Sequence, residues 1–288
     1  MPRLTDLSTI RALCQKHGFS LSKGLGQHFL VNPAVCPRLC EAAGLGPGSD
    51  VLEIGPGFGT LTQELAARAR RVVALEVDSR LLPVLDETLA DYTNVRVVQG
   101  DVMQTDLNAL VAKMFGGPVT VCANLPYYIT SPVVMKLLES RLPANNLTLM
   151  VQKEAAQRMA AAPGSRQAGA ISYAVHYYAQ PKLVFDVSAG SFTPPPKVKS
   201  AVIRLDIRKN PPLADEPERE ARLFRLVRAA FGQRRKTLVN AASAGLGVPK
   251  AALAGAMDTL GLPPLARPEE LTLEQFMALE GELAAGLF

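Results

Sequence analysis

Three glycines at alternating positions follow a short apolar run and constrain the fold more than any other feature of the chain. The run, Val51 to Ile54, is typical of a buried strand, and Gly55, Gly57 and Gly59 come directly after it. Residues 60–68 are rich in strong helix formers. Glycine permits positive φ and a close approach of the backbone to a ligand, and a helix N-terminus presents free N–H groups. Strand, glycine turn and helix together predict the first unit of a doubly wound α/β sheet, with a nucleotide-like ligand at the turn.

The glycine spacing narrows the kind of ligand. Dinucleotide-binding folds use G-x-G-x-x-G, whereas this chain has G-x-G-x-G, with Glu53 two residues ahead of Gly55. A pyrophosphate is negatively charged and would be repelled by that carboxylate. A ligand with a positive group would be attracted to it, and the ammonium of the methionine part of S-adenosylmethionine is such a group. A tight strand-to-helix turn that binds nothing is the alternative for this segment alone.

Two further buried-strand patterns end in acids. They cover 71–78 and 95–101 and carry Glu76 and Asp101 near their ends. Glu76 lies 17 residues after the last glycine of the turn, where the second strand of such a fold offers a carboxylate to ribose hydroxyls. Carboxyl ends of parallel strands share one edge of a sheet, so we expect Gly55, Glu76 and Asp101 side by side where ligands bind. Each acid singly could be a helix cap.

A fourth strand, 119–123, runs into the tetrad Asn124, Leu125, Pro126 and Tyr127. Asn124 Oδ1 and the Pro126 carbonyl are acceptors suited to an exocyclic amine, and Tyr127 can stack on the ring that bears it. These are the needs of methyl transfer to a base amine, in which the base leaves its stack and is aligned with the methyl donor. A plain loop turn is the alternative for the tetrad alone.

The remaining patterns divide the chain into two parts. Helices are expected in 1–20, 33–43, 80–89, 131–138 and 153–162, and strands at 147–152, 183–187 and 200–207, with 173–187 aromatic and β-branched as a whole. The last two strands have too short a link for a parallel crossover and are expected to be antiparallel neighbours. From Asn210 onward, proline, acids and helical stretches without a strand pattern follow. We therefore expect an α/β domain over 1–209, with a mostly parallel sheet and an antiparallel last strand, and a small helical domain over 210–288.

Composition and charge exclude some classes of protein. The 288 residues are 48% hydrophobic and 20% charged, as in an ordinary globular chain. No apolar run approaches the ~18 residues of a membrane helix, the first ten residues lack a signal-peptide core, and four scattered cysteines favour reduced thiols in the cytoplasm. The net charge of +5 is uneven, because 191–250 hold thirteen Lys and Arg against five acids. This density suggests a polyanion partner, although a charged run can also be a solvated face.

Taken together, the motifs resemble the ribosomal RNA adenine N6-dimethyltransferase family. The resemblance covers nearly the whole chain, and it rests on residues 23–30, 53–59, Glu76, Asp101, 124–127, 191–202 and 234–240. It implies a Rossmann-like class I methyltransferase that uses S-adenosylmethionine and no metal. The implied reaction dimethylates two adjacent adenosines near the 3′ end of 16S rRNA, within an immature 30S subunit, during ribosome biogenesis. A cytoplasmic monomer is expected.

The resemblance also implies roles for individual residues. The cofactor contacts would be His28, Leu30, Gly55, Glu76, Asp101 and Asn124. Glu76 would hold the ribose hydroxyls, Asp101 the N6 of the cofactor adenine, and Phe192 would face Tyr127 across the target base. The family more often has asparagine where His28 stands, and a histidine side chain can still make a hydrogen bond there. The glycine-rich basic segment 22–32 reads as a loop that closes over a ligand, with a surface turn as the alternative.

Basic residues near the C-terminus suggest contacts with RNA. They are Arg222, Arg225 and Arg228 at helical spacing, followed by Arg234, Arg235 and Lys236. Contacts of this kind with phosphate position an enzyme without reading sequence. A solvated basic face is the alternative for the first three, and helix capping for the others.

Three other functions are consistent with parts of the pattern. A sister methylase that acts on large-subunit RNA shares the fold, but the helical tail and the stretch 192–198 are closer to the small-subunit enzyme. A binding protein without turnover, acting in ribosome assembly or transcription, would not need the intact set of Glu76, Asp101 and the tetrad. An NAD-dependent oxidoreductase conflicts with the glycine spacing.

Overall fold

The computed structural model describes residues 3–18, 28–233 and 235–287 and divides into two compact units. The first unit combines Met1–Ala156 with Pro181–Ile207, and the second combines Gln157–Gln180 with Arg208–Phe288. The second junction lies close to the change of character expected near residue 210. The grouping of Gln157–Gln180 with the C-terminal helices has no signal in the sequence, because it depends on packing between segments far apart along the chain.

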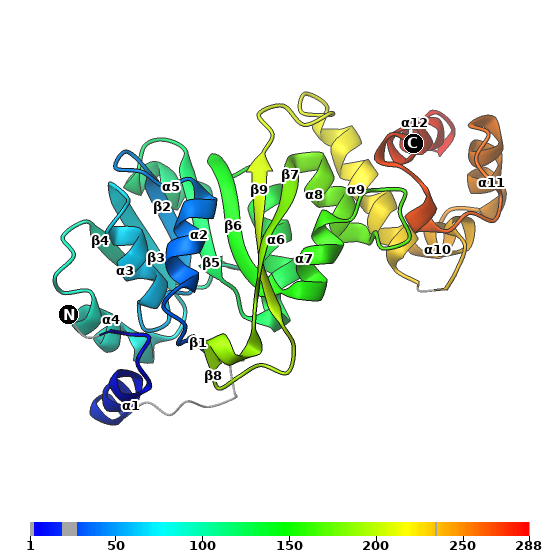
Figure 1. The fold of residues 1–288 in the computed structure, drawn as a ribbon. Helices are drawn as coiled ribbons and strands as arrows, with labels where there is room; N and C mark the ends of the chain where they lie inside the picture. The colour runs from blue at the N-terminus through cyan, green and yellow to red at the C-terminus, as the bar shows by residue number, and fades with distance from the viewer. Residues whose placement is uncertain (1–2, 19–27, 234, 288) are drawn as a thin grey trace. The chain divides into compact units, whose positions relative to one another are not determined.

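The first unit is built on a seven-stranded sheet in the order β4-β3-β2-β5-β6-β9-β7 (Figure 1). Its parallel strands are β2 (Asp50–Ile54), β3 (Arg71–Glu76), β4 (Val95–Gln99), β5 (Val119–Asn124) and β6 (Ala144–Gln152). Strand β9 (Ser200–Ile207) runs antiparallel to β6, and β7 (Ala179–Val187) lies beside β9. The mostly parallel sheet with a late antiparallel strand confirms the fold class.

The register of the central strands gives the two faces of the sheet different chemistry. Leu52, Val121, Leu147 and Leu205 lie opposite one another across β2, β5, β6 and β9, and all are fully buried. The next row on the other face is Glu53, Cys122, Thr148 and Arg204. Because successive side chains of a strand alternate between faces, one face is a dry aliphatic layer and the other carries polar groups.

Helices α2 (Val35–Ala43) and α3 (Thr60–Ala66) cover the face that carries the polar row (Figure 1). Helix α2 ends at Gly44, which is left-handed with φ 69°, as the sequence predicts. The Arg204 guanidinium donates to the Ala42 carbonyl at 2.7 Å, and Asn146 Nδ2 donates to the Ala43 carbonyl at 3.2 Å. Polar side chains of the sheet therefore satisfy carbonyls at the end of α2 that have no partner within the helix.

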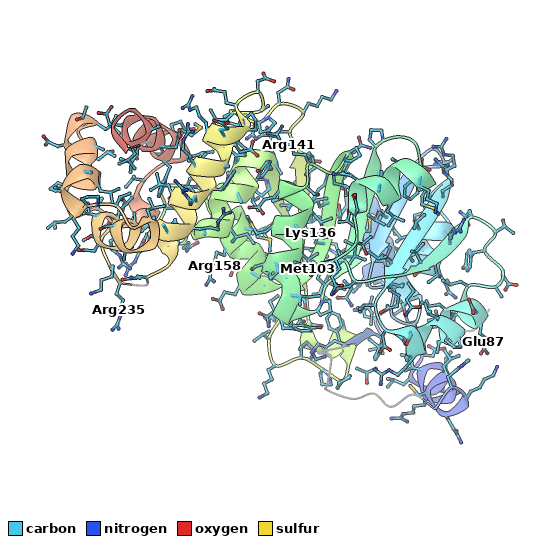
Figure 2. All side chains as sticks on the ribbon, turned by 180° about the vertical axis from the view of Figure 1, so that it is seen from behind. Glu87, Met103, Lys136, Arg141, Arg158 and Arg235 are labelled. Carbon is cyan, nitrogen blue, oxygen red and sulfur yellow. The ribbon has the colours of Figure 1, made fainter. Side chains whose placement is uncertain are left out.

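The N-terminal helix α1 (Leu7–Lys16) packs against α4 (Leu82–Thr88) of the same unit. Lys16 Nζ lies 2.8 Å and His17 Nε2 2.7 Å from the carboxylate of Glu87, which is labelled in Figure 2. The other helices of this unit are α5 (Leu107–Met114), α6 (Thr130–Glu139) and the start of α7 (Lys153–Ala160). Short 3-10 turns are η2 (Ser79–Leu81), η3 (Tyr127–Ile129) and η4 (Ala189–Ser191).

The second unit is helical and has an aromatic core of its own. Its helices are α8 (Ala170–Tyr178), α9 (Pro217–Phe231), α10 (Leu238–Leu246), α11 (Lys250–Thr259) and α12 (Leu273–Leu287), with the turn η5 (Pro268–Glu270). The hydroxyls of Tyr177 and Tyr178 donate to the carboxylate of Glu220 at 2.8 and 2.7 Å. Rings of both tyrosines contact Phe224. The two tyrosines thus join the Glu220 carboxylate, whose oxygens each accept a hydrogen bond, to the aromatic ring of Phe224.

Candidate active site

The carboxyl ends of four neighbouring strands open onto one cavity of 390 Å³. Gly55 after β2, Glu76 at the end of β3, Asp101 after β4 and Asn124 at the end of β5 all line it. These residues are up to 69 positions apart in the chain. The expectation that they meet at one edge of the sheet is confirmed, because parallel strands in adjacent positions bring their carboxyl ends together.

The glycine turn after β2 depends on conformations that other residues rarely adopt. Gly55, Gly57 and Gly59 have φ of 71°, 60° and 89°, all in the left-handed region. A Cβ on Gly59 would lie 3.2 Å from Thr88 Oγ1. The Gly57 N–H donates to Glu76 Oε2 at 3.3 Å. The alternating glycines therefore allow the turn to fold tightly against the end of β3.

Glu76 is held by backbone donors at the floor of the cavity. Its Oε1 accepts from the Asp78 N–H at 2.8 Å and its Oε2 from Gly57. Burial is the main reason that its pKa is raised, and the two backbone hydrogen bonds oppose that shift. The carboxylate is thus fixed in direction, and each oxygen retains lone pairs for a ligand.

Glu53 lies beneath the turn as a buried acid with an unsatisfied oxygen. The residue is 1% exposed, it lines the cavity, and no described residue makes a hydrogen bond to its Oε2. Burial raises the pKa of Glu53 to about 8, the nearby Thr62 hydroxyl opposes this shift, and the charge of Glu76 adds to it. Such a group is costly unless a ligand completes it. The sequence places this acid in a predicted buried strand beside the turn, and the structure adds that Oε2 accepts no hydrogen bond from the described residues.

Asp101 is positioned by the loop that follows β4. Its Oδ1 accepts from the Met103 N–H at 2.8 Å, and its carbonyl accepts from Thr105 Oγ1 at 2.7 Å. Lys136 Nζ on α6 donates to the Met103 carbonyl at 2.7 Å, and Figure 2 shows these two residues near one another. Helix α6 thus steadies the loop that carries the third acidic side chain of the cavity.

The tetrad after β5 forms a turn that is held by hydrogen bonds of its own backbone and side-chain groups. Asn124 Nδ2 donates to the His28 carbonyl at 3.4 Å. Among the described residues this bond uses only the amide nitrogen, so Oδ1 can accept from a ligand. The Leu125 N–H donates to the Met150 carbonyl at 3.1 Å. The Pro126 carbonyl accepts from the Ile129 N–H at 3.3 Å and from Thr130 Oγ1 at 3.2 Å. This differs from the sequence expectation, because both lone pairs of that oxygen serve the turn into α6.

Tyr127 is the aromatic ring of the tetrad and lines the cavity. Its hydroxyl lies 2.6 Å from Ser200 Oγ at the start of β9, a contact that no sequence pattern predicts. Its ring centroid is 5.4 Å from that of His28. Phe192 is 3% exposed and packs in the core, and the described residues that line the cavity do not include it. His28 contacts the rings of both Tyr127 and Phe192, and the role of Phe192 across the target base from Tyr127 stays a prediction.

Residues 18–284 match the family model described as ribosomal RNA adenine dimethylase. The chain belongs to this family. It is 44% identical to the ribosomal RNA small subunit methyltransferase A of Alkaliphilus metalliredigens, over 99% of each chain. It is also 44% identical to the protein of the same name from Geobacillus thermodenitrificans, over 95% of this chain and 94% of the relative.

Two solved structures resemble this dimethylase over most of its length. A dimethyladenosine transferase from Plasmodium falciparum has a TM-score of 0.71 and 28% identity, covering 87% of this chain and 95% of the other. The 23S rRNA methyltransferase ErmE has a TM-score of 0.65 and 29% identity, covering 88% and 99%. Fold similarity thus extends to an enzyme named for large-subunit RNA, whereas the relatives of higher identity carry the small-subunit name.

The basic residues of the dimethylase differ in their surroundings. Arg222 Nε donates to Glu280 Oε1 at 2.7 Å, and the Glu280 side chain is buried. Arg225, Arg228, Arg235 and Lys236 are exposed, and Figure 2 shows Arg235 projecting outward. Arg234 lies outside the described residues, as do residues 19–27, which include most of the expected closing loop. The structure thus gives Arg222 a partner within the protein.

The described residues show neither a metal-binding cluster nor a membrane-spanning helix. No group of three or more His, Cys, Asp and Glu side chains there is arranged to hold a metal ion. None of the helices in that part of the chain is long and apolar enough to span a membrane. The four cysteines are free thiols.

Proposed function

We propose that this chain transfers methyl groups from S-adenosylmethionine to N6 of two adjacent adenosines near the 3′ end of 16S rRNA. The substrate would be the immature 30S subunit during ribosome biogenesis. The observation that carries the proposal is that the glycine turn, two acidic strand ends and the Asn-Leu-Pro-Tyr turn line one cavity. The small-subunit name of the relatives at 44% identity supports this target over large-subunit RNA.

The residues at the β2–β4 end of the cavity fit the cofactor. Bound S-adenosylmethionine supplies a methyl group on a positively charged sulfur. The unsatisfied Oε2 of Glu53 is suited to its ammonium, because a buried carboxylate gains most from a charged donor. Glu76 would accept from the ribose hydroxyls, and Asp101 from the adenine N6. The residues assigned to the cofactor are His28, Leu30, Gly55, Glu76, Asp101 and Asn124, all of which line the cavity.

The tetrad after β5 would hold the target base. Asn124 Oδ1 would accept one N–H of the adenine amine. Because the Pro126 carbonyl is engaged, the Leu125 carbonyl is the better candidate for the second N–H. When both N–H groups of the adenine amine are hydrogen-bonded in this way, the nitrogen lone pair points at the methyl donor. Such alignment can lower the activation barrier of methyl transfer by about 7–11 kcal/mol. No strong base is needed, because the amine loses its proton readily once it bears the new bond.

We also assign roles to the two parts of the chain. Residues 1–209 would carry out methyl transfer and residues 210–288 would contact RNA, with Arg225, Arg228, Arg234, Arg235 and Lys236 facing phosphate. The exposure of the described members of this set supports that role, and the pairing of Arg222 with Glu280 favours a structural role for Arg222. A monomer acting in the cytoplasm fits this substrate.

The decisive experiment offers the purified chain both ribosomal subunits. Small and large subunits lacking these methyl groups are incubated with methyl-labelled S-adenosylmethionine, and the RNA is digested for mass analysis. We expect label in small-subunit RNA only, as two dimethyladenosines next to each other. Label in large-subunit RNA would indicate the sister methylase instead, and RNA binding without label would indicate a protein that has no turnover.

The role of the amide is tested with Asn124→Ala. We expect methyl transfer to fall by at least about a thousandfold, as for loss of a group that aligns the reacting atoms, while some cofactor binding remains. Asn108→Ala is the matched control, since Asn108 is exposed on α5 and donates to the Ser140 carbonyl away from the cavity. Unchanged turnover in Asn124→Ala would exclude this role.

A further inference from the structure

Two lysines between β8 (Phe192–Thr193) and β9 have no acidic partner among the described residues. Lys197 and Lys199 are exposed, and no ion pair or hydrogen bond joins either ammonium group to that part of the chain. Asp186, an acid of the neighbouring strand β7, already pairs with Lys153 at 2.5 Å. The segment therefore carries two positive charges that no described carboxylate neutralises.

The backbone of this segment is joined at both ends to residues that line the cavity. At its start, the Pro194 carbonyl accepts from His28 Nδ1 at 2.7 Å, and at its end the Ser200 hydroxyl lies 2.6 Å from that of Tyr127. His28 and Tyr127 both line the cavity. The two lysines precede Ser200 by one and three positions, so their Cα atoms lie within about 11 Å of its Cα. The positive charges are therefore at the rim of the cavity, on the side of the tetrad.

Further contacts position the backbone between these two ends. The Lys199 carbonyl accepts from the Lys153 N–H at 2.9 Å. Strand β1 (Phe29–Leu30) pairs with β8, directly ahead of the segment, and prolines at 194–196 restrict rotation of the backbone. Figure 1 shows β8 and the start of β9 at the end of the sheet where the parallel strands finish. The two ammonium groups thus extend into solvent from a backbone that is already held in place.

We propose that Lys197 and Lys199 bind the phosphates that flank the target adenosine, so that the methyltransferase unit carries an RNA contact of its own. This inference rests on the proposed function. A flipped-out nucleotide leaves its stack but stays joined to its neighbours through phosphates, and these phosphates must pass the rim of the cavity. A lysine ammonium binds phosphate as a point charge and sets position without reading sequence. The contact is additional to the one assigned to Arg235 and Lys236 in the helical unit.

The salt dependence of RNA binding tests this contact in the full-length chain. Binding of unmethylated small subunits is measured over a salt series at constant Mg²⁺. Replacing both lysines by alanine should reduce the slope of log K against log salt by about 1.4–1.8, the value for two phosphate contacts. Replacing both by arginine keeps the charge and should keep the wild-type slope. An unchanged slope in the double alanine variant, or an equal loss in the double arginine variant, would overturn the inference.

Lys113 provides the matched control. It is exposed in the last turn of α5, and the carbonyls of the two residues after it accept from Arg71 at the start of β3, at the opposite end of the sheet from the cavity. Lys113→Ala removes the same charge from the same unit and should leave the slope unchanged. A reduction equal to that in Lys197→Ala would indicate a general effect of net charge and would overturn the inference. Neither of the two rim lysines lines the cavity, so the Kd for S-adenosylmethionine should stay the same in all these variants.

A photo-crosslink locates the RNA that passes the rim. Val198 is exposed between the two lysines, and replacing it by p-benzoylphenylalanine should give a crosslink within about five nucleotides of the methylated adenosine. A crosslink to a ribosomal protein, or to RNA farther away, would overturn the inference. If the wild-type chain methylates neither subunit, the proposed function fails and this inference fails with it. If it methylates small subunits but the lysine variants keep the wild-type slope, only this inference fails.

Discussion

The hydroxyl of Tyr127 lies 2.6 Å from the hydroxyl of Ser200, and this hydrogen bond joins the turn after β5 to the first residue of β9. Ser200 is fully buried. Burial also raises the pKa of the Tyr127 phenol above its ordinary value, so the hydroxyl keeps its proton at neutral pH. The antiparallel strand β9 thus fixes a ring that belongs to the cavity.

Removing the Tyr127 hydroxyl should have a smaller effect than removing the ring. Tyr127→Phe leaves Ser200 without its partner and should lower the free energy of unfolding by about 0.5–1.5 kcal/mol, with kcat/KM reduced less than about tenfold. Tyr127→Ala should lose a further ~1–3 kcal/mol of base stacking, seen as a higher KM for RNA. Urea unfolding and steady-state kinetics measure the two effects. Equal activity losses in both variants would show that the hydroxyl, rather than the ring, matters.

The buried carboxyl of Glu53 should make cofactor binding depend on pH. With a pKa of about 8, it is largely protonated at pH 6 in the free protein and must ionise to pair with an ammonium. Affinity for S-adenosylmethionine should therefore rise between pH 6 and 8, by up to about tenfold per unit. Calorimetry at several pH values should find this slope reduced in Glu53→Gln. The same slope in both proteins would exclude pairing of Glu53 with the cation.

The same group has the opposite effect on stability of the free protein. Folding raises its pKa from 4.5 to about 8, so the unfolded chain binds fewer protons across this range. Glu53 therefore makes the wild type less stable as pH rises from 4.5 through 8. Thermal unfolding without cofactor should show a weaker decline in Glu53→Gln.

Asp50 should contribute stability that is lost in acid. Its buried carboxylate accepts hydrogen bonds from Nη2 of Arg71 and Nη2 of Arg70, each at 2.6 Å from Oδ2. The hydrogen bond from Arg71 is the largest cause of a pKa lowered from 3.8 to about 2. The stabilisation is present above pH 3.8 and disappears as pH falls through 2. Asp50→Asn should cost about 1–3 kcal/mol at pH 7 and flatten the pH dependence between 4 and 2.

A surface pair in the same unit serves as the control for Asp50. Asp186 is exposed and accepts from Lys153 at 2.5 Å. Asp186→Asn should cost less than about 1 kcal/mol, because solvent screens an exposed ion pair. Denaturant unfolding of both variants makes the comparison. A larger loss in Asp186→Asn would contradict the importance of burial at Asp50.

Two arginines of the helical unit should separate RNA binding from stability. Arg235 is exposed, so Arg235→Ala should reduce the slope of log K against log salt by about 0.7–0.9, the value for one phosphate contact. Arg222 pairs with the buried Glu280, so Arg222→Ala should lower the unfolding temperature and leave the slope unchanged. Filter binding over a salt series and thermal unfolding give both quantities. A slope unchanged by Arg235→Ala would remove its phosphate contact.

Strand ends were predictable because their signal is local. Apolar runs at 51–54 and 71–78 become strands β2 and β3, and the glycines between them adopt the positive φ that no other residue favours. The segment 173–187 shows the limit of this approach. Its aromatic and β-branched residues divide into the end of helix α8 and strand β7, because packing of the tyrosines on Phe224 and around Glu220 outweighs local propensity.

Sequence alone determined the glycine turn, the acids at the strand ends and the tetrad after β5, because each is a pattern of neighbouring residues with its own local chemistry. Tertiary structure alone decided that Glu53 Oε2 accepts no hydrogen bond from the described residues, that the Pro126 carbonyl accepts hydrogen bonds within its own turn and that His28 contacts Tyr127. His28 and Pro194 are 166 positions apart, and Tyr127 and Ser200 are 73 apart. Contacts over such separations depend on strand order and register, which no short stretch of sequence encodes.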